Sequence, residues 1–206
     1  MIQQSLGTSR STIIINLCSL GNNIIGICWG LFVIIWIVTA ISTKRSVYRE
    51  NPGQRLRYML LLVVSCVLLF DARRLPYPFD LRLIACNDII AVACMVACIA
   101  GLVFCIWARL ILGRNWSGAI TLKEDHELIE RGPYRIVRHP IYTGLLVMFF
   151  ATAIFSARIG GLLGLPLVFA SFWMKLRDEE RLMLKQFPDQ YAAYERRTKR
   201  LIPFVL

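Results

Sequence analysis

The chain has 206 residues, of which 57% are hydrophobic, and it carries a formal net charge of +11. A soluble domain is typically about 45–50% apolar, so the composition argues against a soluble protein. The 24 Lys and Arg residues do not form one basic face with interleaved aromatic residues, which argues against nucleic-acid binding. Hydrophobic residues instead collect in long uncharged runs. We therefore expect an all-α, polytopic integral membrane protein with about five transmembrane helices.

The first three spans are expected in the N-terminal half. Ile24–Ile41 is the first clear span, after an interfacial lead-in over residues 1–21 that a Gly-Asn-Asn stretch at 21–23 interrupts. Tyr58–Phe70 is short, because 13 helical residues extend about 20 Å and the hydrocarbon core is about 30 Å thick. This run spans only if flanking residues join the helix. Leu83–Trp107 is long enough to cross with a tilt.

Two further apolar helices, Ile141–Ser156 and Ile159–Met174, are separated by a very tight turn, which predicts an antiparallel helix hairpin. With the N-terminus outside, the inner segments 42–57, 108–139 and 175–206 hold 19 of the 24 basic residues. Cytoplasmic loops carry an excess of Lys and Arg. The charge distribution therefore favours five spans and a cytoplasmic C-terminus.

The cysteines and histidines give no sign of a metal centre. Nearly all of the seven cysteines lie in apolar runs without C-x-x-C spacing, so we expect small hydrophobic packing residues. The two histidines, His126 and His139, show no H-E-x-x-H spacing, and no cysteine lies in the same segments. We therefore expect no bound metal.

The two longest inner segments hold the residues that are suited to chemistry, and neither has room for a separate cofactor domain with its own sheet. Pro140 suits the first turn of a helix, which places His139 beside free N–H groups that favour an anionic ligand group. Further along, Lys175 and Glu179 share one helical face at i and i+4. The remaining tail is expected to form an amphipathic helix over this site.

These inner segments contain a set of short motifs. Its members are Gly132, Tyr134, Arg138, His139, Pro140, Tyr142, Gly144, Glu179, Glu180, Phe187 and Tyr191. Over residues 112–204 the set resembles the isoprenylcysteine carboxyl methyltransferase family, and the short chain is similar to its small prokaryotic-type members. The resemblance implies N-terminal transmembrane helices over residues 1–110 and a methyltransferase core over residues 111–206.

The resemblance also implies S-adenosyl-L-methionine as the cofactor and a lipophilic or lipidated acceptor in the membrane. It assigns to the cofactor Thr121, His126, Glu127, Leu128, Ile129, Tyr134, His139, Pro140, Ile141, Tyr142, Glu179 and Glu180. Catalytic roles fall to Lys175, Arg177 and His139. The family places an arginine where this chain has Lys175. Because lysine offers a point charge and not a bidentate fork, the acceptor group stays open between a carboxylate, a thiol and another nucleophile.

Three other functions remain open. Phospholipid amine N-methylation needs a base to deprotonate an ammonium group, and His139 is the obvious candidate. A sterol-reductase-like enzyme would bind a nicotinamide cofactor, although no extra basic cluster for a 2′-phosphate is evident. A non-enzymatic membrane scaffold would leave the charged inner segments merely solvated.

Overall fold

The computed structural model describes residues 2–41, 46–49, 51–116, 121–123, 128–203 and 205, with side chains from residue 17 onward and none in the two strands. Within these residues the chain forms helices α1 (Ile2–Ala40), α2 (Pro52–Phe70), α3 (Asp88–Leu112), α4 (Pro140–Ser156), α5 (Ile159–Gln186) and α6 (Pro188–Arg197). Short 3-10 helices cover Ala72–Arg74, Gly113–Asn115 and Gly132–Arg135. Strands β1 (Ser46–Arg49) and β2 (Thr121–Lys123) form an antiparallel pair.

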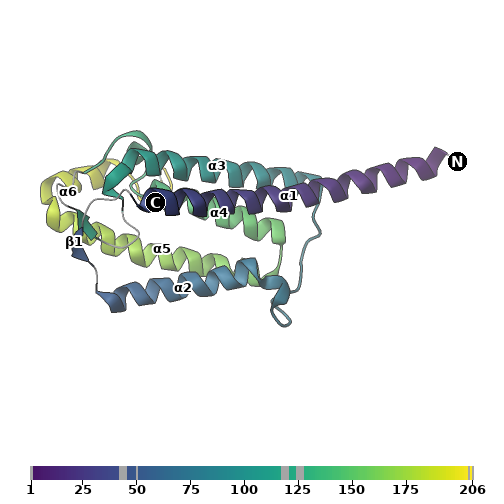
Figure 1. The fold of residues 1–206 in the computed structure, drawn as a ribbon, viewed down its shortest axis with the longest axis horizontal. Coiled ribbons are helices and arrows are strands. Elements are labelled where there is room, and N and C mark those ends of the chain that lie inside the picture. Colours follow the sequence, from purple (N-terminus) through teal and green to yellow (C-terminus); the bar gives the residue numbers. More distant parts are fainter. Residues whose placement is uncertain are drawn as a thin grey trace.

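The five long helices lie side by side in one bundle, and α6 and the two strands lie at one end of it (Figure 1). Among the residues that the structure describes, four helical segments are long and apolar enough to cross a membrane: Leu17–Ala40, Pro52–Phe70, Asp88–Asn115 and Ile159–Gln186. The shorter apolar helix α4 supplies the fifth predicted span. The predicted class, an all-helical multi-pass membrane protein, is confirmed, with the small β1–β2 sheet added to it.

The predicted interruption between a lead-in segment and the first span is wrong, because helix α1 continues without a break through residues 21–23. Gly21 is buried, and a Cβ atom at this position would lie 2.7 Å from the ring of Phe155 in α4. The glycine therefore allows close approach of two helices and does not end one. The N-terminal part of α1 extends beyond the bundle (Figure 1).

Helix caps explain why two spans differ from their predicted bounds. Helix α2 begins at Pro52, because the Asn51 side chain accepts a hydrogen bond of 2.9 Å from the Gly53 N–H. This start lengthens the short second span to 19 residues. Helix α3 begins later than predicted, after Asn87, whose side chain accepts a hydrogen bond of 2.9 Å from the Ile90 N–H.

Glycines bring the α3 and α4 backbones into close contact. A Cβ atom at Gly144 would lie 2.5 Å from the Cys105 Sγ and 2.6 Å from the Gly101 carbonyl oxygen. We expect Gly144→Ala to destabilise the protein by about 1–3 kcal/mol, because overpacking forces the helices apart. Thermal unfolding in detergent measures the loss. Gly26→Ala is the matched control, since nothing lies within 4 Å of a Cβ atom there, and an equal loss in both variants would contradict this account.

A disulfide joins Cys18 of α1 to Cys86, which lies just before α3. The prediction that the cysteines are packing residues is therefore wrong for this pair. The two cysteines are 68 residues apart, and such connectivity is not readable from sequence spacing. The free cysteines, buried or half-buried, are Cys28, Cys66, Cys94, Cys98 and Cys105.

The disulfide gives a direct chemical prediction. In protein unfolded with a strong detergent, a maleimide reagent should modify five cysteines before reduction and all seven afterwards. The number of added groups is counted by intact-protein mass spectrometry. Modification of seven cysteines without reduction would show that Cys18 and Cys86 are not joined.

Candidate active site

The start of α4 lies where the sequence predicts it. His139 is the N-cap residue and Pro140 occupies the first turn. The His139 N–H donates to the Arg200 carbonyl oxygen at 3.0 Å, and the preceding Arg138 N–H donates to the Lys199 carbonyl oxygen at 2.7 Å. The C-terminal tail therefore runs beside the entry to α4 and fixes the backbone on which His139 stands.

Glu179 is the carboxylate on which three side chains converge. The Tyr142 hydroxyl donates to its Oε1 at 2.7 Å. The His139 Nδ1 lies 3.7 Å from Oε2, and the Lys175 Nζ lies 3.9 Å from Oε1. Its side chain remains 24% exposed. Glu179 is thus positioned by neighbours from α4 and α5 and still accessible to a cationic ligand group.

Lys175 lies between two aromatic rings. Its Nζ is 5.5 Å from the ring centroid of Tyr58 in α2 and 5.7 Å from that of Tyr142 in α4. An ammonium group within about 6 Å of an aromatic face is attracted by the ring quadrupole. The position between α2, α4 and α5 fixes a positive charge at the point where polar and apolar side chains meet.

Glu180 has a different environment from that of Glu179. It is buried, and its Oε1 lies 2.8 Å from the Arg138 Nη2 and 3.2 Å from the His139 Nε2. The Arg200 Nε donates to its Oε2 at 2.8 Å. Glu180 therefore ties α5 to the start of α4 and to the C-terminal tail, and it does not line the cavity described next.

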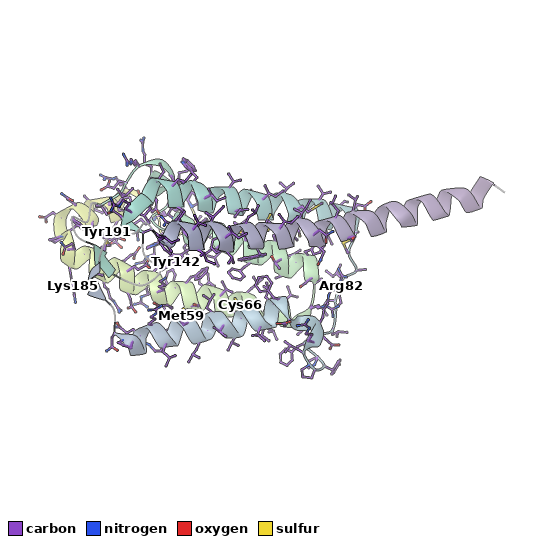
Figure 2. The ribbon with its side chains drawn as sticks, viewed as in Figure 1. Met59, Cys66, Arg82, Tyr142, Lys185 and Tyr191 are labelled. Carbon is purple, nitrogen blue, oxygen red and sulfur yellow. A yellow bond between two sulfur atoms is a disulfide. The ribbon has the colours of Figure 1, made fainter. Side chains whose placement is uncertain are left out.

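A cavity of about 610 Å³ runs through the bundle beside Glu179. Its inner end is lined by polar and aromatic side chains, among them Glu179, His139, Tyr134, Tyr191 and Tyr194. Its other end is lined by apolar side chains from α1, α2, α4 and α5: Trp29, Phe32, Val33, Met59, Leu62, Cys66, Phe70, Leu145, Phe149 and Phe172. Figure 2 shows Tyr191, Tyr142 and Cys66 in this order along the bundle.

Tyrosines line the inner end of the cavity, beside α6. The Tyr194 hydroxyl of α6 donates to the Tyr134 carbonyl oxygen at 2.6 Å, and the ring of Tyr191 meets that of Tyr194 edge to face. Burial raises the pKa of the phenol groups of Tyr191 and Tyr194, so both stay neutral at physiological pH. They offer aromatic walls and neutral hydroxyl groups to a bound molecule.

The structure brings most of the predicted site residues together. The predicted residues that line the cavity are Leu128, Ile129, Tyr134, His139, Pro140, Ile141, Tyr142, Lys175 and Glu179. Arg177 is exposed and does not line it, because residues two positions apart on a helix face different directions. His126 and Glu127 lie outside the described residues, as does the side chain of Thr121 in β2.

Other residues of the cavity escaped the sequence analysis. Asn115 and Trp116 follow α3, Leu182 and Met183 lie one turn after Glu179, and a row of aromatic side chains comes from the N-terminal spans. Spacing from Glu179 could have indicated Leu182 and Met183, which are at i+3 and i+4 on the same face. The aromatic residues of α1 carry no local signal, because they depend on how α1 packs.

A comparison with protein families matches a segment from the middle of the chain to the last long helix. Residues 91–185 match the model described as the isoprenylcysteine carboxyl methyltransferase (ICMT) family. This segment includes most of α3, the start of α4 with His139, and the part of α5 that carries Lys175 and Glu179.

Relatives with curated names support the match. Protein-S-isoprenylcysteine O-methyltransferase B of Arabidopsis thaliana is 30% identical over 101 residues, which cover 48% of this chain and 51% of that protein. Methanethiol S-methyltransferase 1 of Bradyrhizobium diazoefficiens is 27% identical over 164 residues, which cover 75% of this chain and 56% of that protein. This chain spans about half the length of the curated relatives that it matches.

A solved structure extends the likeness beyond the matched segment. The eukaryotic intramembrane Ras methyltransferase ICMT superposes with a TM-score of 0.51 and 26% sequence identity, covering 77% of this chain and 55% of that one. The likeness thus includes helices before residue 91. The segment that carries His139, Lys175 and Glu179 is therefore similar to the isoprenylcysteine carboxyl methyltransferase family.

Proposed function

We propose that this protein is a membrane methyltransferase that uses S-adenosyl-L-methionine and methylates a nucleophile on a small lipophilic acceptor. One observation carries the proposal. A single cavity joins the carboxylate of Glu179 at its inner end to an apolar chamber between the membrane helices. A polar cofactor and an apolar acceptor can therefore meet inside the bundle, out of bulk water.

The inner end fits this cofactor. Glu179 is a partly exposed carboxylate suited to the α-amino group, and the first-turn N–H groups of α4 are suited to the carboxylate. The aromatic rings of Tyr191 and Tyr194, with Leu128 and Ile129, supply walls for adenine. When bound, the cofactor supplies an electrophilic methyl group on a sulfonium. The chain's own contribution is to position the acceptor and to exclude water.

Lys175 is placed to orient the acceptor. Its ammonium lies at the boundary between the polar end and the apolar chamber, next to Tyr58 and Tyr142. A positive charge there attracts a carboxylate and equally stabilises a thiolate. The two ring nitrogens of His139 contact Glu179 and Glu180. His139 therefore acts as a positioning residue for the site and not as the base that deprotonates the acceptor.

A thiol is the acceptor group that two observations favour. Among the described residues that line the cavity, the Lys and Arg side chains, Lys175 and Arg138, are already paired with Glu179 and Glu180. A carboxylate acceptor is ionised at pH 7 and would need an unpaired cation to enter the cavity, whereas a thiol is mostly neutral and can enter before it ionises. In sequence, the methanethiol enzyme of Bradyrhizobium diazoefficiens also aligns with 75% of this chain, against 48% for the isoprenylcysteine enzyme of Arabidopsis thaliana.

The test is a transfer assay with purified protein and tritium-labelled S-adenosyl-L-methionine. The acceptors are short alkyl thiols, prenylated cysteine analogues and total membrane lipids. We expect label in the alkyl thiols, with a rate that rises about tenfold per pH unit from about pH 6 to 8, because the thiolate is the nucleophile and the pKa of a simple alkyl thiol lies above this range. Transfer only to a carboxylate, with a flat rate from about pH 6 to 8, would overturn the thiol assignment. Transfer to none of these acceptors would overturn the proposed function.

The proposed orientation places the N-terminus outside and the C-terminus in the cytoplasm. The inner segments hold 19 of the 24 basic residues. The disulfide of Cys18 and Cys86 joins α1 to the segment just before α3, and the start of α3 lies at the opposite end of the bundle from α6 (Figure 1). Disulfides persist in oxidising compartments. A C-terminal tag should therefore resist protease in intact cells and be cut after lysis. Cleavage in intact cells would reverse the orientation.

A further inference from the structure

The apolar chamber ends in a floor of three aromatic residues. On each of three helices the lining residue farthest from Glu179 is aromatic: Trp29 on α1, Phe70 on α2 and Phe149 on α4. Trp29 meets the ring of Phe70 edge to face at 5.2 Å, and its ring centroid lies 4.7 Å from that of Phe149. Aromatic rings from three helices therefore contact one another at this end of the chamber.

Trp29 is the fixed centre of this floor. Its indole Nε1 donates to the Thr152 Oγ1 at 3.0 Å, and the Thr152 hydroxyl donates to the Met148 carbonyl oxygen at 2.8 Å. Thr152 is buried. An indole N–H that finds its partner inside an apolar bundle holds the ring in one orientation, so the floor is a rigid surface.

The distance from the reacting end to the floor is short. Tyr142, whose ring lies beside Lys175, and Phe149 are seven positions apart on α4. Seven helical residues rise about 10 Å. A short alkyl or aryl group fits into that depth, whereas an extended farnesyl chain is longer and would strike the indole ring.

We propose that Trp29 is the specificity-determining residue that sets the longest apolar group the enzyme accepts. The inference rests on the proposed function, because it assumes that the acceptor enters this chamber with its nucleophile toward Lys175. Trp29 then selects acceptors by steric exclusion at the floor, while the residues around Glu179 serve every acceptor alike. Neither the matched family segment nor its motifs include this residue, since the segment begins at residue 91.

The test compares kcat/KM over a series of straight-chain alkyl thiols of increasing length. For the unaltered protein we expect a steep fall at the length that reaches the floor, by about tenfold or more per added methylene, as for an overfilled apolar pocket. Trp29→Ala should move this fall to longer thiols and raise kcat/KM at least tenfold for the first thiol that the unaltered protein rejects. The shortest thiols should lose rate, since the enlarged chamber holds them loosely.

Two further variants make the result decisive. Trp107→Ala is the matched control, because Trp107 is exposed on α3 and does not line the cavity, and its length profile should stay unchanged. If Trp29→Ala does not fold, Phe70→Ala opens the same floor from the end of α2 and should shift the profile in the same direction. If the folded floor variants methylate short thiols but keep the length profile of the unaltered protein, Trp29 does not set the acceptor length. The proposed function would still stand. No methylation of any thiol by the unaltered protein would instead refute the proposed thiol acceptor.

Discussion

Glu179→Ala is expected to weaken strongly the binding of S-adenosyl-L-methionine to the purified protein. Glu179 is the partly exposed carboxylate at the polar end of the cavity, aligned by the Tyr142 hydroxyl at 2.7 Å. Truncating one partner of a hydrogen-bonded charge pair in a desolvated site costs about 2–5 kcal/mol, which is a loss of affinity of roughly 30-fold or more. Isothermal titration calorimetry in detergent measures it.

Asp178→Asn is the control for this prediction. Asp178 is the acid next in sequence, but its carboxylate pairs with Arg181 at 2.9 Å and does not line the cavity. This variant should bind the cofactor as the unaltered protein does. If Glu179→Ala keeps the full affinity, or if both variants lose it equally, Glu179 does not hold the cofactor.

Glu180→Ala is expected to destabilise the fold more than any other single change at this site. Glu180 is buried and pairs with Arg138, which is also buried, and with Arg200 of the tail. Removing one member of a buried pair leaves an uncompensated charge and costs about 3–5 kcal/mol. For a chain of this size, the unfolding temperature should fall on the order of 10 °C, measured by thermal unfolding in detergent.

Glu195→Ala provides the matched comparison. Glu195 contacts the same two arginines at 3.4 and 3.7 Å, but its side chain is 38% exposed. An ion pair in contact with water contributes about 0–1 kcal/mol, so the unfolding temperature should change little. Equal losses in Glu180→Ala and Glu195→Ala would show that burial of the Arg138–Glu180 pair does not carry the stability of this junction.

Local patterns in the sequence predicted the parts of the site that local chemistry determines. Pro140 required a helix start, which placed His139, and the i, i+4 spacing placed Lys175 beside Glu179. The apolar runs gave the helices. The same helical periodicity separates Arg177 from the cavity, and a stricter use of it would have removed this residue from the catalytic set.

Features that depend on packing between distant segments were not predictable. Nothing local distinguishes Cys18 from the free cysteines, because its partner is 68 residues away. Glu180 and Glu179 are adjacent in sequence, and only the position of Arg138 decides which of them is buried in a pair. In the sequence, Trp29 is only one aromatic residue in a membrane span. Its position at the floor of the chamber depends on the packing of α2 and α4, which place two more rings against it.

The division into N-terminal helices and a methyltransferase core remains a prediction, and the cavity draws on both parts. Residues of α1 and α2 form much of the apolar chamber, while the polar end comes from α4, α5 and α6. We therefore propose that the first 110 residues set the size of the acceptor, and that the later segments hold the cofactor and orient the nucleophile of the acceptor.

The most direct measurement is an experimental structure of the protein with S-adenosylhomocysteine and a short alkyl thiol bound together. The proposed function predicts the amino group of the cofactor product at Glu179 and the sulfur of the thiol beside Lys175. It also predicts the alkyl chain pointing toward Trp29. Cofactor density outside this cavity, or a thiol bound away from the chamber between α1, α2, α4 and α5, would contradict it.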